Sequence, residues 1–376
     1  MLITSKNVWL NETFVPATIT IEKGRIQTVM PGMSAEAKNY GEHFIIPGMI
    51  DIHTHGYGGG SSTDGDPEVI RRWVRYYPQE GVTTFLPGVM VRKEERIKAS
   101  LQAIADVKDE QLKGAEIYGT FLQAPFLDHN YCGTYDRFLL KKPSLEKIKE
   151  YIELSRNTIR SISLAPEHDQ DHEVLKYCVD HGIRVCLGFS GCSYEEAVQA
   201  IKEGASNVVH CFNCMAPLLS RDPHLPAAAL LEKQVYSEVM ADGIHVHPAV
   251  LQLVGQMKGK DRLITVTDSS NMKGMKPGFY HTDVRDITVC EDGVGRMPNG
   301  KIAGSMKTMI ENVKNLQEIG QLPLVTAINA ATINPARMLG IDDKKGLIKA
   351  GYVADLAIYD ADYKIIQTYV HGEAML

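Results

Sequence analysis

The strongest constraint on the fold is a regular alternation of short apolar runs and helical patterns through the middle of the chain. Eight strand-sized runs occur at residues 49–54, 83–88, 116–122, 159–164, 183–188, 207–212, 235–240 and 262–267. Helical patterns separate them, and eight strand–helix units in about this length are what a (β/α)8 barrel of the α/β class requires. The alternative is an open doubly wound parallel sheet. Polar residues gather where the runs end, as the active face of a barrel requires, and this favours the barrel.

Both chain ends have a different pattern, with short alternating strands and turns. Residues 17–21 and 26–29 read as a hairpin, and residues 354–359 and 365–370 read as two more strands. Neither end is large enough to form a stable sheet alone. We therefore expect residues 1–48 and 336–376 to form one small β-sandwich beside a barrel of residues 49–335.

Composition excludes several classes of function. The net charge of −6, without a basic block, argues against nucleic acid as a partner. Since no apolar stretch approaches the roughly 20 residues of a membrane span, we expect no membrane association. The first residues do not resemble a signal peptide, and the seven cysteines are odd in number and scattered. These features predict reduced thiols and a cytoplasmic location.

Two histidines end the first barrel run. His53 and His55 are separated by one residue, so that on a strand both side chains point to the same face. A glycine-rich segment, residues 56–60, follows and lets backbone approach a ligand closely. Surface histidines can pair in this way by chance, but converging imidazoles at the end of a barrel strand favour a metal site.

Two more candidate residues end later runs. His210 follows residues 207–209, and Asp268 follows residues 263–267. His210 could be a core histidine and Asp268 a helix cap. In a barrel, however, both residues reach the same face as His53 and His55. A carboxylate beside a metal can take a proton from water and give it to a leaving amine.

Three further features are less specific. Arg221 could match phosphate oxygens with its guanidinium fork and Asn213 could complete the cradle, although an arginine in a loop is usually only solvated. Cys211 and Cys214 form a Cys-x-x-Cys without a second pair at zinc spacing, so we interpret it as coincidence. Residues 268–303 predict a long loop without a helix, typical of a functional lid.

Taken together, these segments resemble the N-acetylglucosamine-6-phosphate deacetylase family of the amidohydrolase superfamily over nearly the whole chain. The matching segments are residues 46–56, 81–87, 164–167, 210–215, 241–248, 266–268, 302–305 and 334–336. The resemblance implies a barrel with a β-sandwich, a phosphosugar substrate, metal-dependent deacetylation in amino-sugar catabolism, and a homodimer. It implies that Asp268 is the catalytic aspartate. It also implies that the phosphate is held by Asn213, the backbone at Cys214, Arg221 and His245.

The sequence departs from the family pattern at three positions. Gln123 stands where the third strand has a glutamate ligand, Phe189 where the fifth strand has a histidine ligand, and Tyr135 where a histidine contacts the sugar. An amide is a much weaker ligand than a carboxylate, and a phenyl ring donates nothing. Gln123 and Tyr135 are then expected to line the substrate pocket.

From these losses we infer one divalent ion, zinc, per chain. His53, His55 and Asp268 would hold it, with His210 as fourth ligand or as a donor to water or carbonyl. Three functions are compatible with such a site: a deacetylase of an N-acetylamino-sugar phosphate, a phosphosugar-binding protein without hydrolase activity, and an amidohydrolase with a shifted phosphorylated substrate.

Overall fold

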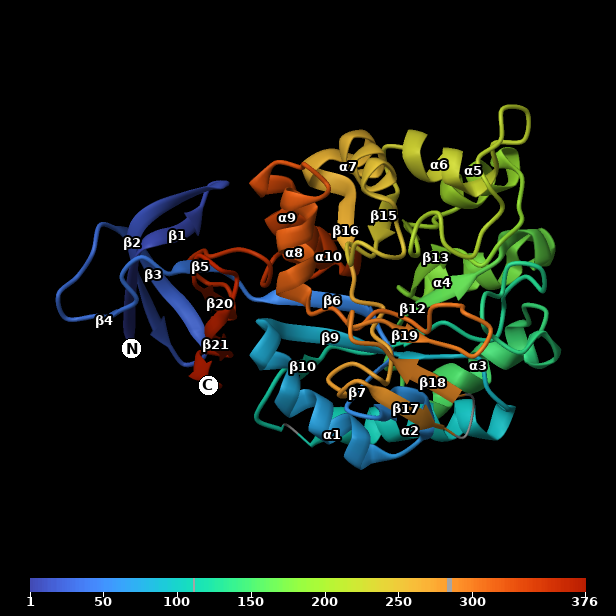
Figure 1. Ribbon diagram of the computed structural model, residues 1–376, viewed down its shortest axis with the longest axis horizontal. Coiled ribbons are helices and arrows are strands. Elements are labelled where there is room, and N and C mark those ends of the chain that lie inside the picture. Colours follow the sequence, from blue (N-terminus) through green and yellow to red (C-terminus); the bar gives the residue numbers. More distant parts are fainter. Residues whose placement is uncertain (111, 283–285) are drawn as a thin grey trace.

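The computed structural model describes residues 1–110, 112–282 and 286–376. Figure 1 shows a barrel surrounded by helices, with a separate β sheet on one side that carries both chain termini. The predicted barrel and the predicted joining of the two chain ends are both confirmed. Within the described residues, no helix is both long and apolar enough to cross a membrane.

The barrel wall has eight strand positions, and one of them is shared by two short strands. All neighbouring strands pair in parallel. In order around the wall they are β6 (Met49–Thr54), β9 (Val82–Val89), β10 (Glu116–Ile117) with β11 (Thr120–Leu122), β12 (Ile159–Leu164), β13 (Arg184–Leu187), β14 (Asn207–Val208), β15 (Tyr236–Val239) and β16 (Leu263–Thr265).

The barrel closes between its first strand, β6, and the segment that follows its last strand, β16. The backbone N–H of Asp268 donates to the His53 carbonyl at 2.9 Å, and the N–H of His55 donates to the Ser269 carbonyl at 3.1 Å. Deeper in this seam, the Thr267 hydroxyl donates to the buried Asp51 carboxylate at 2.6 Å. These bonds hold the residues after β16 against the end of β6.

Helices cover the outside of the barrel (Figure 1). Several begin with a capping box, as where Ser193 accepts from the N–H of Glu196 and Thr308 accepts from that of Glu311. The α-helices are α1 (Pro67–Tyr76), α2 (Glu94–Asp109), α3 (Leu145–Leu154), α4 (Glu173–Asp180), α5 (Tyr194–Lys202), α6 (His224–Leu231), α7 (Pro248–Arg262), α8 (Met309–Glu318), α9 (Leu324–Ala331) and α10 (Ile333–Leu339). Short 3-10 turns are η1 (Ser62–Asp64), η2 (Tyr77–Glu80), η3 (Arg137–Leu139), η4 (Pro166–His168) and η5 (Gln170–His172).

The chain ends pair into one eight-stranded sheet that encloses a hydrophobic core of its own. Strand β5 pairs in parallel with β1 and antiparallel with β20, so it joins the N-terminal and C-terminal strands. The strands in order are β22 (Glu373–Ala374), β21 (Ile365–Val370), β20 (Leu356–Tyr359), β5 (Phe44–Pro47), β1 (Leu2–Leu10), β2 (Thr13–Glu22) and β3 (Arg25–Pro31), with β4 (Lys38–Asn39) beside β1.

The long segment after β16 has more order than the sequence suggested. As predicted, its described residues contain no helix, but they form a small antiparallel sheet of β17 (Gly278–His281), β18 (Asp286–Val289) and β19 (Gly295–Arg296). A two-stranded ribbon, β7 (Gly56–Tyr57) with β8 (Gly60–Ser61), follows β6. The backbone N–H of Gly59 donates to the Asn271 carbonyl at 2.8 Å, so the two loops lie against each other above the barrel.

Candidate metal and phosphosugar site

The site lies at the carboxyl ends of the barrel strands, where polar side chains meet from β6 and from the residues just after β6, β14 and β16. His53 lies in β6 and His55 directly follows this strand, and their rings lie 5.1 Å apart between centroids. Both side chains are almost completely buried. The expected convergence of the two histidines is therefore present.

Asp268 contacts both of these imidazoles. Its Oδ1 atom lies 3.3 Å from His55 Nε2 and 3.5 Å from His53 Nε2. Asp268 has a left-handed backbone, with a φ of 42°, which is uncommon for a residue other than glycine. The seam bond from its N–H to the His53 carbonyl fixes this residue beside β6.

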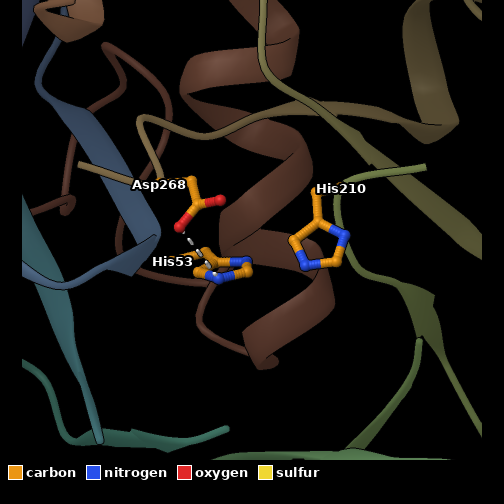
Figure 2. A group of neighbouring side chains, drawn as sticks. All are labelled: His53, His210 and Asp268. Carbon is orange, nitrogen blue, oxygen red and sulfur yellow. Dashed lines mark ion pairs between the residues drawn. The ribbon is translucent and has the colours of Figure 1, made fainter. Parts of the chain in front are cut away.

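His210 completes a cluster of possible ligands. One ligand atom each from His53, His210 and Asp268 lies within 4.8 Å of the others. Figure 2 shows the Asp268 carboxylate directed towards His53, with the His210 ring beside it. Strand β14 is shorter than predicted because the chain leaves the strand at His210, which has a φ of 28°.

The donor set fits a divalent cation. The buried His210 Nδ1 atom has no hydrogen-bond partner among the described residues, and the buried His55 Nε2 atom has only its ion-pair contact with Asp268 at 3.3 Å. An unpaired polar atom at full burial is costly, and a bound cation would satisfy a lone pair there. Imidazole nitrogens and a carboxylate are ligands that zinc accepts.

The carboxylates and imidazoles at the cluster shift one another's pKa values. Burial alone would raise the pKa of Asp268, but the imidazoles of His53 and His55 outweigh it and hold this pKa well below its usual range. Burial alone would lower the pKa of His53, but the carboxylates of Asp268 and Glu238 outweigh it and raise this pKa. Burial lowers the pKa of His210 to about 4. The cluster is thus built around an ionised carboxylate.

Gln123 and Tyr135 form a hydrogen-bonded pair beside the cluster. The Gln123 Nε2 atom lies 2.9 Å from His53 Nε2, and the Tyr135 hydroxyl donates to Gln123 Oε1. The Phe189 ring packs edge-on against His210, with 4.6 Å between the ring centroids. Phe189 therefore fills space beside His210 without offering a ligand atom.

A pocket opens above the cluster. It is lined by His55, Gln123, Tyr135, Phe189, His210, Asn213, Cys214, His245 and Asp268, among others. The Asn213 Nδ2 atom is buried and has no hydrogen-bond partner among the described residues. The His245 Nδ1 atom lies 2.5 Å from Asp242 Oδ2. Burial lowers the pKa of His245, but this bond to Asp242 outweighs it and raises the pKa. Asn213 and His245 thus offer donors to an anion.

Arg221 is not brought to this pocket. It is exposed in the segment before α6 and does not line the pocket wall. The phosphate contact that the resemblance implies for Arg221 stays a prediction.

Glu238 was missed by the sequence analysis. It lies inside β15, is 1% exposed, and its Oε2 atom lies 2.8 Å from His53 Nδ1. A signal was present in the sequence, because a glutamate inside an apolar run needs a buried partner.

A second group, Asp128, Glu167 and His168, also brings possible ligand atoms together. Its carboxylates already have hydrogen-bond donors. Asp128 accepts from the N–H of Asn130 at 2.7 Å, and Glu167 accepts from the N–H of Gly191 at 2.6 Å. We interpret this group as structural, because it holds the loops around the pocket.

Comparison with known proteins agrees with this geometry. The model of the amidohydrolase family matches residues 44–375. The chain is 32% identical to the N-acetylglucosamine-6-phosphate deacetylase of Vibrio furnissii, over 90% of this chain and 84% of that protein. It is 30% identical to the N-acetylgalactosamine-6-phosphate deacetylase of Escherichia coli O157:H7, over 88% and 87% of the two chains.

Among solved structures, the chain is similar to a variant of the N-acetyl-D-glucosamine-6-phosphate deacetylase of Mycobacterium smegmatis in complex with N-acetyl-D-glucosamine-6-phosphate. The TM-score is 0.94 at 29% sequence identity, and the match covers 100% of this chain and 99% of that chain.

Proposed function

Since the chain belongs to the amidohydrolase family, we propose that it hydrolyses the N-acetyl group of an amino-sugar 6-phosphate in a metal-dependent reaction. The observation that carries this proposal is the cluster of His53, His210 and Asp268 at the floor of a pocket that also exposes Asn213 and His245. One end of the pocket has ligands for a cation, and its wall has donors for an anion. A phosphorylated N-acyl sugar needs both.

We propose that His53, His55, His210 and Asp268 hold one zinc ion. The unpartnered buried nitrogen of His210 and a carboxylate between the imidazoles of His53 and His55 support this ligand set. When bound, the ion supplies Lewis-acid chemistry, which polarises an amide carbonyl and makes a nearby water more acidic.

The side chains of the site then have separate roles in proton transfer and in substrate binding. Asp268, the ionised member of the cluster, accepts a proton from the attacking water and passes it to the departing amine nitrogen. His245, paired with Asp242, places positive charge in the pocket wall. Asn213 Nδ2 is a free donor for a phosphate or sugar oxygen. Tyr135 and Gln123 shape the side of the pocket next to His53.

A shifted substrate is the second candidate. Gln123 and Tyr135 are bonded to each other at the pocket wall, and relatives of this chain act on two different sugar epimers. The substrate of this chain is therefore proposed as a class, an N-acylated amino-sugar 6-phosphate.

We further propose a homodimer in the cytoplasm, on the resemblance and on the thiols. All seven cysteines are free, which agrees with a reducing compartment. Sedimentation of the purified protein measures the oligomeric state.

The function is tested by acetate release from the zinc-loaded protein. N-acetylglucosamine-6-phosphate and N-acetylgalactosamine-6-phosphate are compared, with unphosphorylated N-acetylglucosamine as the control sugar. Activity on a phosphorylated sugar that is lost in Asp268→Asn supports the proposal. Binding of both phosphosugars without acetate release would support the binding protein instead, and release only from other N-acyl phosphosugars would support the shifted substrate.

A further inference from the structure

Glu238 is a buried carboxylate that contacts the metal cluster from behind. Three donors converge on it from two neighbouring segments, β6 and the β14 segment. They are His53 Nδ1 at 2.8 Å, the backbone N–H of His210 at 3.3 Å, and the side-chain amide of Asn207. Since all three neighbours approach with N–H groups, the Glu238 carboxylate acts as an acceptor towards each of them.

This arrangement determines which nitrogen of His53 carries the proton. A neutral imidazole has one donor and one acceptor nitrogen, and a carboxylate can only accept. The contact with Glu238 therefore places the proton on Nδ1. The unprotonated Nε2 atom then faces Asp268 and Gln123, on the side of the cluster.

The orientation of Gln123 agrees with this assignment. The atom that faces the unprotonated Nε2 of His53 must be a donor, so the Gln123 amide nitrogen lies on that side at 2.9 Å. Its oxygen then faces Tyr135, whose hydroxyl donates to it. The hydrogen bonds thus run in one direction, from Tyr135 through Gln123 and His53 to Glu238. A cation bound at His53 Nε2 would take the place of the hydrogen bond from Gln123, because this nitrogen has one lone pair.

The same carboxylate holds His210. Its bond to the His210 N–H anchors the backbone at the point where the chain leaves β14 with positive φ. Glu238 therefore contacts two of the three residues whose ligand atoms cluster together.

We propose that Glu238 is a positioning residue of the metal centre, which fixes His53 with its proton on Nδ1 so that Nε2 is presented to a divalent cation. This inference rests on the proposed metal-dependent function. A carboxylate that accepts from a ligating histidine fixes its ring and raises its basicity, and removal of such a partner commonly costs 10- to 100-fold in metal affinity.

The first test uses the unaltered protein. It is labelled with 15N-histidine, and the ring signals of His53, assigned by their loss in His53→Ala, are recorded by NMR before and after addition of zinc. We expect a proton on Nδ1 in both spectra, and an unprotonated Nε2 whose signal is shifted once zinc is bound. A zinc-loaded protein in which His53 carries its proton on Nε2 would overturn the proposal.

The second test measures zinc affinity by competition with a chelator, without any sugar. Glu238→Gln should bind zinc about 10- to 100-fold more weakly, and Glu238→Asp should fall between it and the unaltered protein. The control is Asp355→Asn, which removes another buried carboxylate, one that pairs with Lys345 in the small β domain. The control should bind zinc as the unaltered protein does.

Unchanged zinc affinity in both Glu238 variants would overturn the proposal, as would an equal loss in Asp355→Asn. If Glu238→Gln fails to fold, Glu238→Asp and the NMR measurement still decide. Neither test uses a sugar, so failure of the proposed deacetylase activity would show separately as absent acetate release from a protein that binds zinc normally.

Discussion

The Gln123 amide nitrogen lies 2.9 Å from His53 Nε2, where the related family pattern has a carboxylate. In this orientation the amide oxygen, the only atom of Gln123 that could bind a cation well, faces Tyr135 instead. Gln123 therefore borders the metal cluster as a hydrogen-bond donor. The three departures noted in the sequence are in contact here, since Phe189 packs near Tyr135 with 5.7 Å between ring centroids.

Restoring two of these positions should create a second metal position. In the double variant Gln123→Glu with Phe189→His, the two new ligands would lie beside His210. We expect zinc content to rise from about one to about two equivalents, measured by elemental analysis. Each single variant should stay near one equivalent, because two ligands rarely hold zinc against water. Replacing Phe189 should cost on the order of 1–3 kcal/mol in the free energy of unfolding. A folded double variant that gains no metal would show that the pocket has diverged beyond these positions.

Loss of His53 should empty the first metal position. His53→Ala removes the imidazole that contacts both Asp268 and Glu238, so zinc content should fall well below one equivalent after dialysis. Phe189→Ala is the matched control, because Phe189 is buried in the same cluster but offers no ligand atom. Equal zinc content in the two variants would exclude His53 as a ligand.

His245 should contribute to recognition of the phosphate. His245→Ala removes a charge-assisted donor from the pocket, and we expect binding of the 6-phosphosugar to weaken by about 1.5–3 kcal/mol. Binding of the unphosphorylated sugar should change little, and titration calorimetry with Asp268→Asn as the inactive background measures both.

The variant Arg221→Ala, made in the same Asp268→Asn background, tests whether Arg221 contacts the phosphate as the resemblance implies. The exposed position of Arg221, outside the pocket wall, predicts an unchanged affinity for the phosphosugar in this chain. A loss that matches that of His245→Ala, and that is absent for the unphosphorylated sugar, would instead place Arg221 at the phosphate.

Stability should depend on pH through Glu116 at the junction of the two parts of the molecule. Burial raises the pKa of Glu116, but His371 and Lys345 outweigh it and lower the pKa from 4.5 to about 2. Because the folded-state pKa is depressed, this stabilisation is complete above about pH 5 and is lost as the pH falls from about 4.5 towards 2. It amounts to at most about 3 kcal/mol, because solvent screens the partly exposed Glu116 carboxylate.

The variant Glu116→Gln isolates this contribution. Its free energy of unfolding, from urea titrations, should lie below that of the unaltered protein at pH 7, and the difference should shrink between pH 4.5 and pH 3. A difference that stays constant over this range would assign the effect to packing.

The sequence predicted the barrel because each apolar run forms one strand position of the wall and polar residues follow several of the runs. The runs at 49–54 and 159–164 are strands over those residues. The run at 207–212 was predicted too long, because the His210 N–H turns to the Glu238 side chain instead of continuing the ladder. Side-chain competition of this kind leaves no trace in hydrophobic periodicity.

Within the site, the histidines and Asp268 could be predicted because their position at strand ends follows from the barrel itself. The role of Glu238 could not be assigned in the same way. It depends on the contact of this side chain with His53, and the sequence does not show which side chain of a neighbouring strand lies beside it. Arg221 was assigned by resemblance, and it does not line the pocket in this chain, although Asn213 and Cys214 of the same segment do. Loop geometry is set by contacts far apart in the sequence and is the part that local patterns predict least.

The seam between β6 and the end of β16 has a consequence for the order in which the protein becomes functional. His53 emerges early in synthesis and Asp268 more than two hundred residues later, yet the N–H of Asp268 donates to the carbonyl of His53. A nascent chain that has not yet formed the last barrel strand contains the histidines of the cluster but lacks the Asp268 carboxylate. The proposed cation site is therefore complete only in a barrel whose first and last strands have met, and cation binding would report closure of the barrel.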